Sequence, residues 1–421
     1  MKTIRKCNFT TKQCFIICLI VILLSNLAIM AAFKYDDILS YTAWSVDFWD
    51  CLFHGKLSTY YEYSETSLRG AVHGCPDGSY LTFFPWIIWN LPLFLFNINS
   101  SKNVTGSFCL LWSKCLLLLC LAFTAFYAFK IVKKLTDDNV ELALLSSILI
   151  TGSIEIMSST AYAGQDEIIY ICAFLAATYH FMTGQRRAAI ILSVISFTIC
   201  PLMIIPLAYL WVIYEKNIIK LISWGIISLA PSLIFDLLYR GSDMYQSVKG
   251  VNTLLTFQLM VNTTVFDSAI SNFSIPCVIL ILGVIFAYLW VDKDSDKIML
   301  LLSIVFFIFC FFMRHTFYRS FLYVPFFAIL ACSYKDLSLP RSLALYITGF
   351  LRVIYYMICT PAYCFSKNSL YTNYGQFFSE DPAICSYIVL NPLLQDTAII
   401  FLRALIMGAS FFILLSFAVK K

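Results

Sequence analysis

Long apolar segments recur along almost the whole chain of 421 residues. A helix needs about 20 predominantly apolar residues to cross the hydrocarbon core of a bilayer. Hydrophobic residues make up 60% of the sequence and charged residues only 13%, a balance that excludes a water-soluble domain of this size. The segments expected to span are 13–33, 108–129, 140–160, 167–183, 217–238, 275–291, 298–313, 319–334, 342–362 and 396–418.

Two further apolar segments contain prolines and are not expected to cross as single straight helices. Region 187–214 has Pro201 and Pro206 near its middle, so it is expected to form two short helices of about 21 Å each, with a turn near Cys200-Pro201. One long helix that breaks the charge rule is the alternative. Segment 80–98 contains two prolines and is expected to lie at the membrane interface or to re-enter it.

Basic residues favour the cytoplasmic side of a membrane protein, and their positions give a consistent topology. We expect about 12 transmembrane helices, two of them short, with both termini in the cytoplasm. The whole chain, 1–421, then forms one integral membrane domain of the plasma membrane. Its extracytoplasmic loops are 34–107, with interfacial helices, 239–274 and 363–395. The basic residues that set this orientation are Lys2, Arg5, Lys6, Lys12, Lys130, Lys133, Lys134, Arg186 and Arg187.

Two acidic pairs stand beside predicted spans. Asp36-Asp37 directly follows the first apolar segment, and Asp166-Glu167, preceded by Gln165, begins the fourth. Carboxylates beside a bilayer are costly unless they have a partner or a role. The predicted topology puts both pairs on the extracytoplasmic face at the same depth, which is typical of a membrane-embedded active site. The alternative is ordinary helix N-termini, where acidic residues are favoured.

Other charged residues extend this candidate site. Asp47 lies further along the first loop, and a carboxylate there is a second candidate for deprotonating an acceptor hydroxyl. Arg314, His315 and Arg319 are expected on the same face, where cations suit a phosphate leaving group. An ordinary loop that happens to be basic is the alternative.

Three cationic residues lie within apolar segments. Each costs about 2.5–3.5 kcal/mol at the bilayer centre unless its side chain reaches the interface. Lys114 and Arg403 lie near helix ends and are expected to reach it. Arg352 lies nearer the middle and is expected to have a partner, either a lipid phosphate or a neighbouring helix.

Composition also limits the cofactors and partners. The 16 cysteines lie mostly in apolar segments and show no zinc-ligand spacing, so no zinc site is predicted. A divalent cation held by Asp36, Asp37 and Asp166 is left open. The net charge of +5 is spread between apolar segments and does not indicate nucleic-acid binding.

The order of these features resembles the GT-C superfamily of membrane glycosyltransferases, over residues 13 to about 335. Members place an acidic residue or pair just after the first helix, and many carry a Gly-Gln-x-Asp-like motif near the fourth. This chain departs from the pattern in a longer interval before Gly55, in Cys200-Pro201 where many members have Lys, and in the late basic motif. The similar features are Asp36-Asp37, Tyr41, Gly55, Phe83 to Phe96, Gly164-Gln165-Asp166, the pair of short helices at 187–214, and Arg314 to Arg319.

The resemblance implies transfer of a sugar from a polyprenyl-phosphate carrier to a lipid, glycan or protein acceptor on the extracytoplasmic face, as in mannosyltransferase-like enzymes of cell-envelope glycans. Asp37 or Asp36 is expected to act as the base. Asp166 and Glu167 are expected to orient the acceptor or sugar, and the late basic residues to hold the carrier phosphate. A transporter or flippase of lipid-linked saccharides is the alternative, and an inactive scaffold is a third. Membrane lipids are expected partners in each case.

Overall fold

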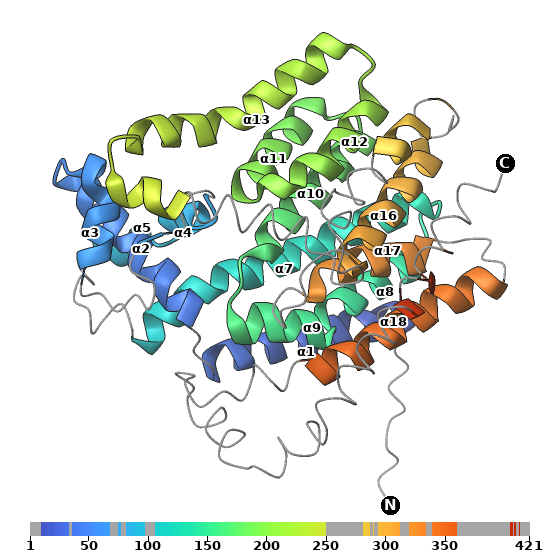
Figure 1. Ribbon diagram of the computed structural model, residues 1–421. Helices are drawn as coiled ribbons and strands as arrows, with labels where there is room; N and C mark the ends of the chain where they lie inside the picture. Colours follow the sequence, from blue (N-terminus) through green and yellow to red (C-terminus); the bar gives the residue numbers. More distant parts are fainter. Residues whose placement is uncertain are drawn as a thin grey trace, which may run out of the picture.

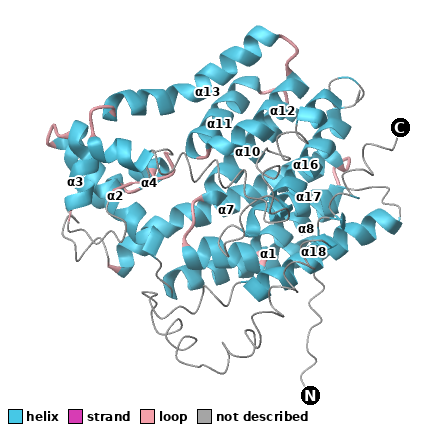
Figure 2. Ribbon diagram, in the orientation of Figure 1, coloured by secondary structure: helices cyan, strands magenta, loops and turns pink. Residues whose placement is uncertain are grey.

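The computed structural model describes residues 10–32, 36–67, 75–76, 81–96, 106–249, 281–286, 289, 294–311, 320–333, 339–359, 405–406, 408–409 and 412. Within these ranges the regular structure is helical and no strand is formed (Figure 2). The predicted all-α class is therefore confirmed for the described part of the chain. The predicted loop 363–395 and residue Arg403 lie outside it, as does all but the beginning of loop 239–274.

Within the described residues, three helices are long and apolar enough to cross a membrane. A fourth span results if α8 and the helical residues directly after it are counted as one. In a bilayer all backbone N–H and C=O groups must be satisfied within the protein, and a helix achieves this within one segment. The three helices are α1 (Thr11–Ala32), α7 (Ser107–Leu135) and α13 (Ile218–Tyr239), and α8 is Val140–Thr151.

The predicted twelve passes are not confirmed. Two expected spans form helices that are shorter than the roughly 20 residues a crossing needs. They are α10 (Glu167–Met182) and α17 (Val324–Ser333). Region 187–214, which was expected to form two short helices, forms α11 (Arg186–Ile199) and α12 (Ile204–Tyr214). α16 (Asp294–Phe311) and α18 (Leu339–Cys359) are longer, and each carries charged residues.

Helix α7 forms the centre of the bundle (Figure 1). It packs against α1, α8, α10 and α17, while α10 also packs against α11, and α16 against α17. Helices α11 and α12 are separated by Cys200 and a single 3-10 turn, Pro201–Met203. Proline has no N–H and its ring clashes with the preceding turn of an α-helix, which accounts for the break.

Helix α8 ends at Gly152, within the segment 140–160 that was expected to form one span. A short helix, α9 (Ile154–Ile156), and a π-helix, η2 (Met157–Ala163), follow at a bend of 43°. Asn26 of α1 is fully buried and donates from Nδ2 to the carbonyl oxygen of Thr151 at 3.1 Å. A Cβ on Gly152 would lie only 3.2 Å from Ile22 Cδ1, so this glycine allows α1 to approach the break closely.

The residues after α1 form a small subdomain that we call the aromatic cap. It consists of α2 (Asp36–Phe53), α3 (Tyr60–Thr66), α4 (Phe84–Trp89), α5 (Leu91–Leu95) and the helical residues 243–249. Figure 1 shows the cap at one end of the bundle, where α13 also ends. Its buried core is mainly aromatic, with Trp44, Tyr60, Tyr61, Phe83, Tyr239 and Tyr245.

Candidate functional site

The N-terminus of α2 meets the residues that connect η2 to α10. Asp37, in the first turn of α2, accepts a hydrogen bond through Oδ2 from Nε2 of Gln165. One turn later, the hydroxyl of Tyr41 donates to Oδ1 of Asp166 at 3.2 Å. The two acidic motifs, more than 120 residues apart in the sequence, therefore lie side by side. We call this place the acidic junction.

Gly164 makes the turn that brings these residues to α2. Its φ of +69° lies in the left-handed region, a backbone conformation that residues with a side chain rarely adopt. An added Cβ would also lie 3.1 Å from Cβ of Ile38, so the turn packs directly onto α2. The first position of the Gly-Gln-Asp motif therefore requires glycine for two reasons, the left-handed backbone conformation and the close contact with Ile38.

Lys114 of α7 holds the other side of this turn. Its ammonium group donates to the carbonyl oxygens of Ala161 and Tyr162, at 3.0 and 2.9 Å, which belong to the last turn of η2. Lysine commonly satisfies such end-of-helix carbonyls. Lys114 was expected to reach the membrane interface; in the structure the residue is fully buried and its ammonium binds backbone carbonyls inside the bundle.

Tyr41 is fixed by a second set of contacts. Its ring stacks on Trp86 of α4, with centroids 4.3 Å apart and planes within 5°. Trp86 in turn donates from Nε1 to the carbonyl oxygen of Ser113 at 3.2 Å. The Ser113 hydroxyl both accepts from Thr42 at 2.8 Å and donates to Asn90 at 3.2 Å. This network joins α2, α4 and α7 and holds the Tyr41 hydroxyl against Asp166.

The acidic junction is mostly shielded from water. Gln165, Asp166 and Glu167 are 3, 7 and 4% exposed, whereas Asp37 is half-buried. Asp37 also lies at a helix N-terminus, where the helix dipole favours the anionic carboxylate. Of the described acids here, Asp37 is the one that a solute reaches most easily.

The other predicted site residues fall elsewhere. Asp36 is the first residue of α2, and its side chain is outside the described part. Asp47 is fully buried and lies about 15 Å from Asp37 along α2 at 1.5 Å per residue. Its charge acts instead on Tyr60, whose pKa is raised well above the usual range by burial, by Tyr61 and by Asp47. The sequence offered both acids as the candidate base, and the structure shows Asp37 bonded to Gln165 of the second acidic motif.

Arg314, His315 and Arg319 lie outside the described residues, so their predicted role as phosphate ligands stays a prediction. In the part of the chain that the structure describes, no three His, Cys, Asp or Glu side chains come together in a way that would hold a metal ion. The proposed cation site at Asp36, Asp37 and Asp166 includes a side chain outside that part.

A second buried acid was missed by the sequence analysis. Glu155 of α9 is 2% exposed and accepts hydrogen bonds from the hydroxyls of Ser153, at 2.6 Å, and Tyr323, at 2.7 Å. The guanidinium of Arg352 lies over the Tyr323 ring, 4.7 Å from its centroid. We call these four residues the Glu155 cluster. Arg352 was expected to have either a lipid phosphate or a neighbouring helix as its partner, and here it contacts Tyr323, the last residue of the 3-10 helix η5 (Ser320–Tyr323).

A signal for Glu155 was present in the sequence. It is a carboxylate within an apolar segment, 140–160, and such residues mark functional or paired sites by default. Its partner Tyr323 lies 168 residues away, and no local pattern indicates that pairing.

Comparison with known proteins adds no family to these observations. No protein-family model matches the chain, and no curated protein or solved structure matches it either. The function is therefore argued from the geometry of the site and from the resemblance in motif order.

Proposed function

We propose that this chain is an integral membrane glycosyltransferase that moves a sugar from a polyprenyl-phosphate carrier to an acceptor hydroxyl, with Asp37 as the general base. The observation that supports this most is the hydrogen bond between Asp37 and Gln165. It joins the two acidic motifs at the N-terminus of α2, and a position beside the membrane that a polyprenyl donor occupies is part of the proposal. The extracytoplasmic orientation, the 12-pass topology and the carrier are part of the proposal.

The reaction proposed is a single displacement at the sugar C1. The acceptor O–H proton passes to the Asp37 carboxylate while the acceptor oxygen bonds to C1. The bond from C1 to the phosphate oxygen breaks, and the polyprenyl phosphate leaves with the electron pair. Inversion at C1 follows from attack on the opposite face. Because the donor is already activated, positioning and charge stabilisation supply most of the acceleration.

Gln165 and Tyr41 are proposed as positioning residues. The amide of Gln165 orients the Asp37 carboxylate, and the hydroxyl of Tyr41 orients Asp166. A general base must be held within reach of the proton that it accepts, and these two hydrogen bonds fix where the carboxylates lie.

The test is transfer of labelled sugar from a panel of polyprenyl-phosphate sugars, by the full-length protein in lipid nanodiscs with total membrane acceptor. Asp37→Asn keeps an oxygen that accepts from Gln165 but removes the charge. We expect transfer to fall about 10²–10⁴-fold, the usual contribution of general acid–base catalysis. Asp138→Asn is the matched control, because Asp138 is exposed, lies outside the site and has a positive φ of 69° that asparagine tolerates.

Full transfer by the Asp37→Asn protein would overturn Asp37 as the base. If Asp47→Asn abolished transfer and Asp37→Asn did not, the role of general base would be assigned to Asp47. Absence of transfer from every donor would count against the enzyme itself.

A transporter or flippase of lipid-linked saccharides is the second candidate, and the Glu155 cluster favours it. Transporters use buried ionisable groups at interrupted helices, and Glu155 directly follows the break after α8. The measurement is movement of a fluorescent polyprenyl-phosphate sugar across vesicles that contain the protein. Movement that Glu155→Gln stops and Asp37→Asn leaves intact would favour the transporter.

A further inference from the structure

Basic residues gather where α11 and α13 begin. From Arg186 to Lys220 the sequence contains four basic residues and a single acid, Glu215. Arg186 and Arg187 open α11, while Lys216 and Lys220 lie on either side of the start of α13. We call these four cations and Glu215 the basic corner. Its charges do not cancel, because four positive groups face one carboxylate.

Glu215 draws two of these cations together. Its Oε2 lies 3.3 Å from a guanidinium nitrogen of Arg186 and 3.4 Å from the ammonium nitrogen of Lys220. Its Oε1 accepts from the backbone N–H groups of Lys216 and Asn217, each at 3.0 Å. Arg186 and Lys220 therefore lie side by side around one carboxylate, although they come from different helices.

The exposure of these groups decides what an approaching anion meets first. The Glu215 side chain is only 9% exposed, and both of its oxygens already have partners. The side chains of Arg186 and Lys220 are 56 and 57% exposed. An anion that approaches from outside therefore meets the two cations before the carboxylate, and attraction by the cations outweighs repulsion by Glu215.

Exposed apolar side chains adjoin the same corner. Helix α13 is long and apolar enough to cross a membrane, and a helix that crosses begins where the hydrocarbon core meets the lipid head groups. Ile218, Ile219 and Ile222, in the first two turns of α13, are each more than half exposed. On α11, which packs against α13, Ile191 is exposed as well. The corner thus combines exposed cations with an exposed apolar surface.

An anionic phospholipid matches both parts of this surface. Its phosphate accepts hydrogen bonds from guanidinium and ammonium groups, and each of these groups has several donors, of which Glu215 faces only one. Its acyl chains would cover the isoleucines, which a free phosphate would leave exposed. We propose that the basic corner binds the head group of one anionic phospholipid, with Arg186 and Lys220 on the phosphate and the acyl chains along α13.

This site is distinct from the acidic junction. Helix α10 begins at Glu167, beside the junction, and ends at Met182, four residues before Arg186. Its 16 residues extend over about 24 Å at 1.5 Å per residue. The phospholipid is therefore not the donor that would react at Asp37. The proposal stands whether or not the chain is a glycosyltransferase, and whichever way it crosses the membrane.

The test is native mass spectrometry of the full-length protein released from detergent micelles. Phosphatidylglycerol, phosphatidylcholine with the same acyl chains, and glycerol phosphate are titrated separately. We expect phosphatidylglycerol to bind about tenfold or more tightly than either of the others, because each basic residue near an anionic lipid contributes about fivefold. Equal binding of phosphatidylcholine would overturn the need for a net negative head group. Equal binding of glycerol phosphate would overturn the role of the acyl chains.

Two variants locate the binding. Lys220→Gln and Arg186→Gln should each weaken phosphatidylglycerol about fivefold, because each removes one of the two cations beside Glu215. Binding of phosphatidylcholine should not change. Both side chains are mostly exposed, so both variants are expected to fold, and thermal unfolding of each is recorded. Phosphatidylglycerol binding that is unchanged in both variants would overturn the basic corner as the site.

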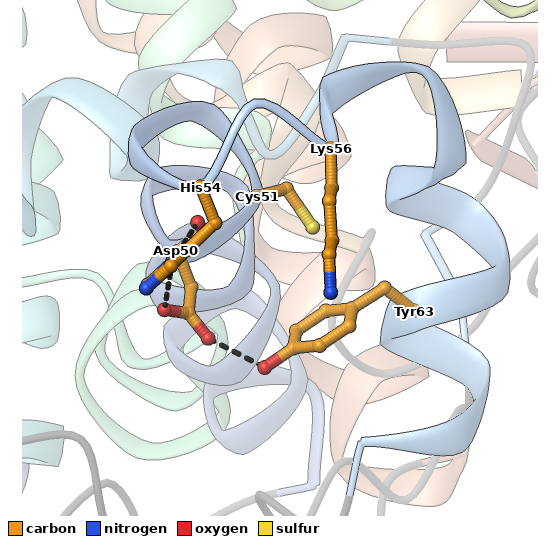
Figure 3. A pocket seen from close by; sticks show the side chains of 5 residues that line it. All are labelled: Asp50, Cys51, His54, Lys56 and Tyr63. Carbon is orange, nitrogen blue, oxygen red and sulfur yellow. Dashed lines mark hydrogen bonds and ion pairs between the residues drawn. The ribbon is translucent and has the colours of Figure 1, made fainter.

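Two lysines outside the corner supply the matched controls. Lys133 lies in the last turn of α7, at the same end of the bundle, since the neighbouring Lys134 donates to the carbonyl oxygen of Met182. Lys56 lies in the aromatic cap, where it lines a small cavity beside Asp50 (Figure 3). Lys133→Gln and Lys56→Gln should both leave phosphatidylglycerol binding unchanged. A loss in Lys133→Gln as large as in Lys220→Gln would show a diffuse attraction to the whole surface and overturn the site.

Discussion

The acidic junction and the Glu155 cluster both hold a carboxylate at an interrupted helix, but they hold it differently. At the junction, Asp37 is half-buried and accepts a hydrogen bond from the amide of Gln165. In the cluster, Glu155 is 2% exposed, accepts from two hydroxyls, and has the cation of Arg352 over the Tyr323 ring. A carboxylate that solutes reach suits proton transfer, whereas one enclosed by three helical segments suits holding those segments together.

The difference predicts which region controls activity and which controls stability. Variants at the junction should reduce transfer more than stability. Variants in the Glu155 cluster should reduce stability first, if the chain is the enzyme proposed above. The variants below test this contrast, from the largest expected effect on stability to the smallest.

Lys114→Met should have the largest effect, because it removes the ammonium group that bonds the carbonyl oxygens of Ala161 and Tyr162. Each buried acceptor left unsatisfied costs about 1–3 kcal/mol, so a loss of roughly 2–6 kcal/mol is expected. Transfer should be lost as well, since the turn at Gly164 is no longer held. Thermal unfolding in detergent and transfer at low temperature measure the two effects. A variant with normal stability and transfer would show that Lys114 does not position the turn.

Tyr323→Phe should lower stability and spare transfer. It removes the hydroxyl that donates to Glu155 at 2.7 Å but keeps the ring under Arg352. The expected loss is about 1–3 kcal/mol, because a buried oxygen of Glu155 loses its hydrogen-bond donor. Chemical denaturation measures the loss, and transfer is assayed well below the melting temperature. Tyr63→Phe, which also removes a phenol bonded to a carboxylate, is the matched control at the cap. Abolished transfer in folded Tyr323→Phe would erase the contrast between the two regions.

Gly164→Ala should lower the free energy of unfolding by about 1–2 kcal/mol, because alanine is strained in a left-handed backbone conformation. The added Cβ would also lie 3.1 Å from Cβ of Ile38. Gly184→Ala separates the two causes, because Gly184 has a φ of +78° and nothing within 4 Å of an added Cβ. We expect Gly164→Ala to be the more destabilising variant and the only one of the pair to reduce transfer. Equal effects on stability and no loss of transfer would argue against close packing of the turn on α2.

Glu215→Gln should have the smallest effect, and its effect should depend on pH. Backbone N–H groups, of Asn217 first, and the ammonium of Lys220 lower the pKa of Glu215. A group with a lowered pKa stabilises the folded state above its unfolded pKa, and this contribution is lost as the pH falls through the folded value. The melting temperature of the variant should therefore lie below that of the parent at pH 7 and approach it at acidic pH. A constant difference at all pH values would contradict this ionic role.

Some features of the site were within reach of the sequence. The two acidic motifs were expected at one depth on one face of the membrane. The structure joins the motifs through the bonds of Gln165 to Asp37 and of Tyr41 to Asp166, and the depth and the face stay predictions. Gly164 was singled out only as the first residue of the Gly-Gln-Asp motif, and the structure added that it makes the turn. The choice between Asp37 and Asp47 was not within reach, because both fit a base in the same loop. Their separation along one helix favours Asp37, since only this acid approaches the second motif.

The sequence alone determined that the chain is helical and enters a membrane. The reason is that long apolar segments gain by leaving water, and inside lipid a helix satisfies its own backbone hydrogen bonds. Only the tertiary structure decided which polar side chains meet. Lys114 with the end of η2, Tyr323 with Glu155, and Gln165 with Asp37 are each brought together from distant parts of the chain. Hydrophobic periodicity indicates which face of a helix is buried, but the neighbour that this face contacts is set by the packing of the whole bundle.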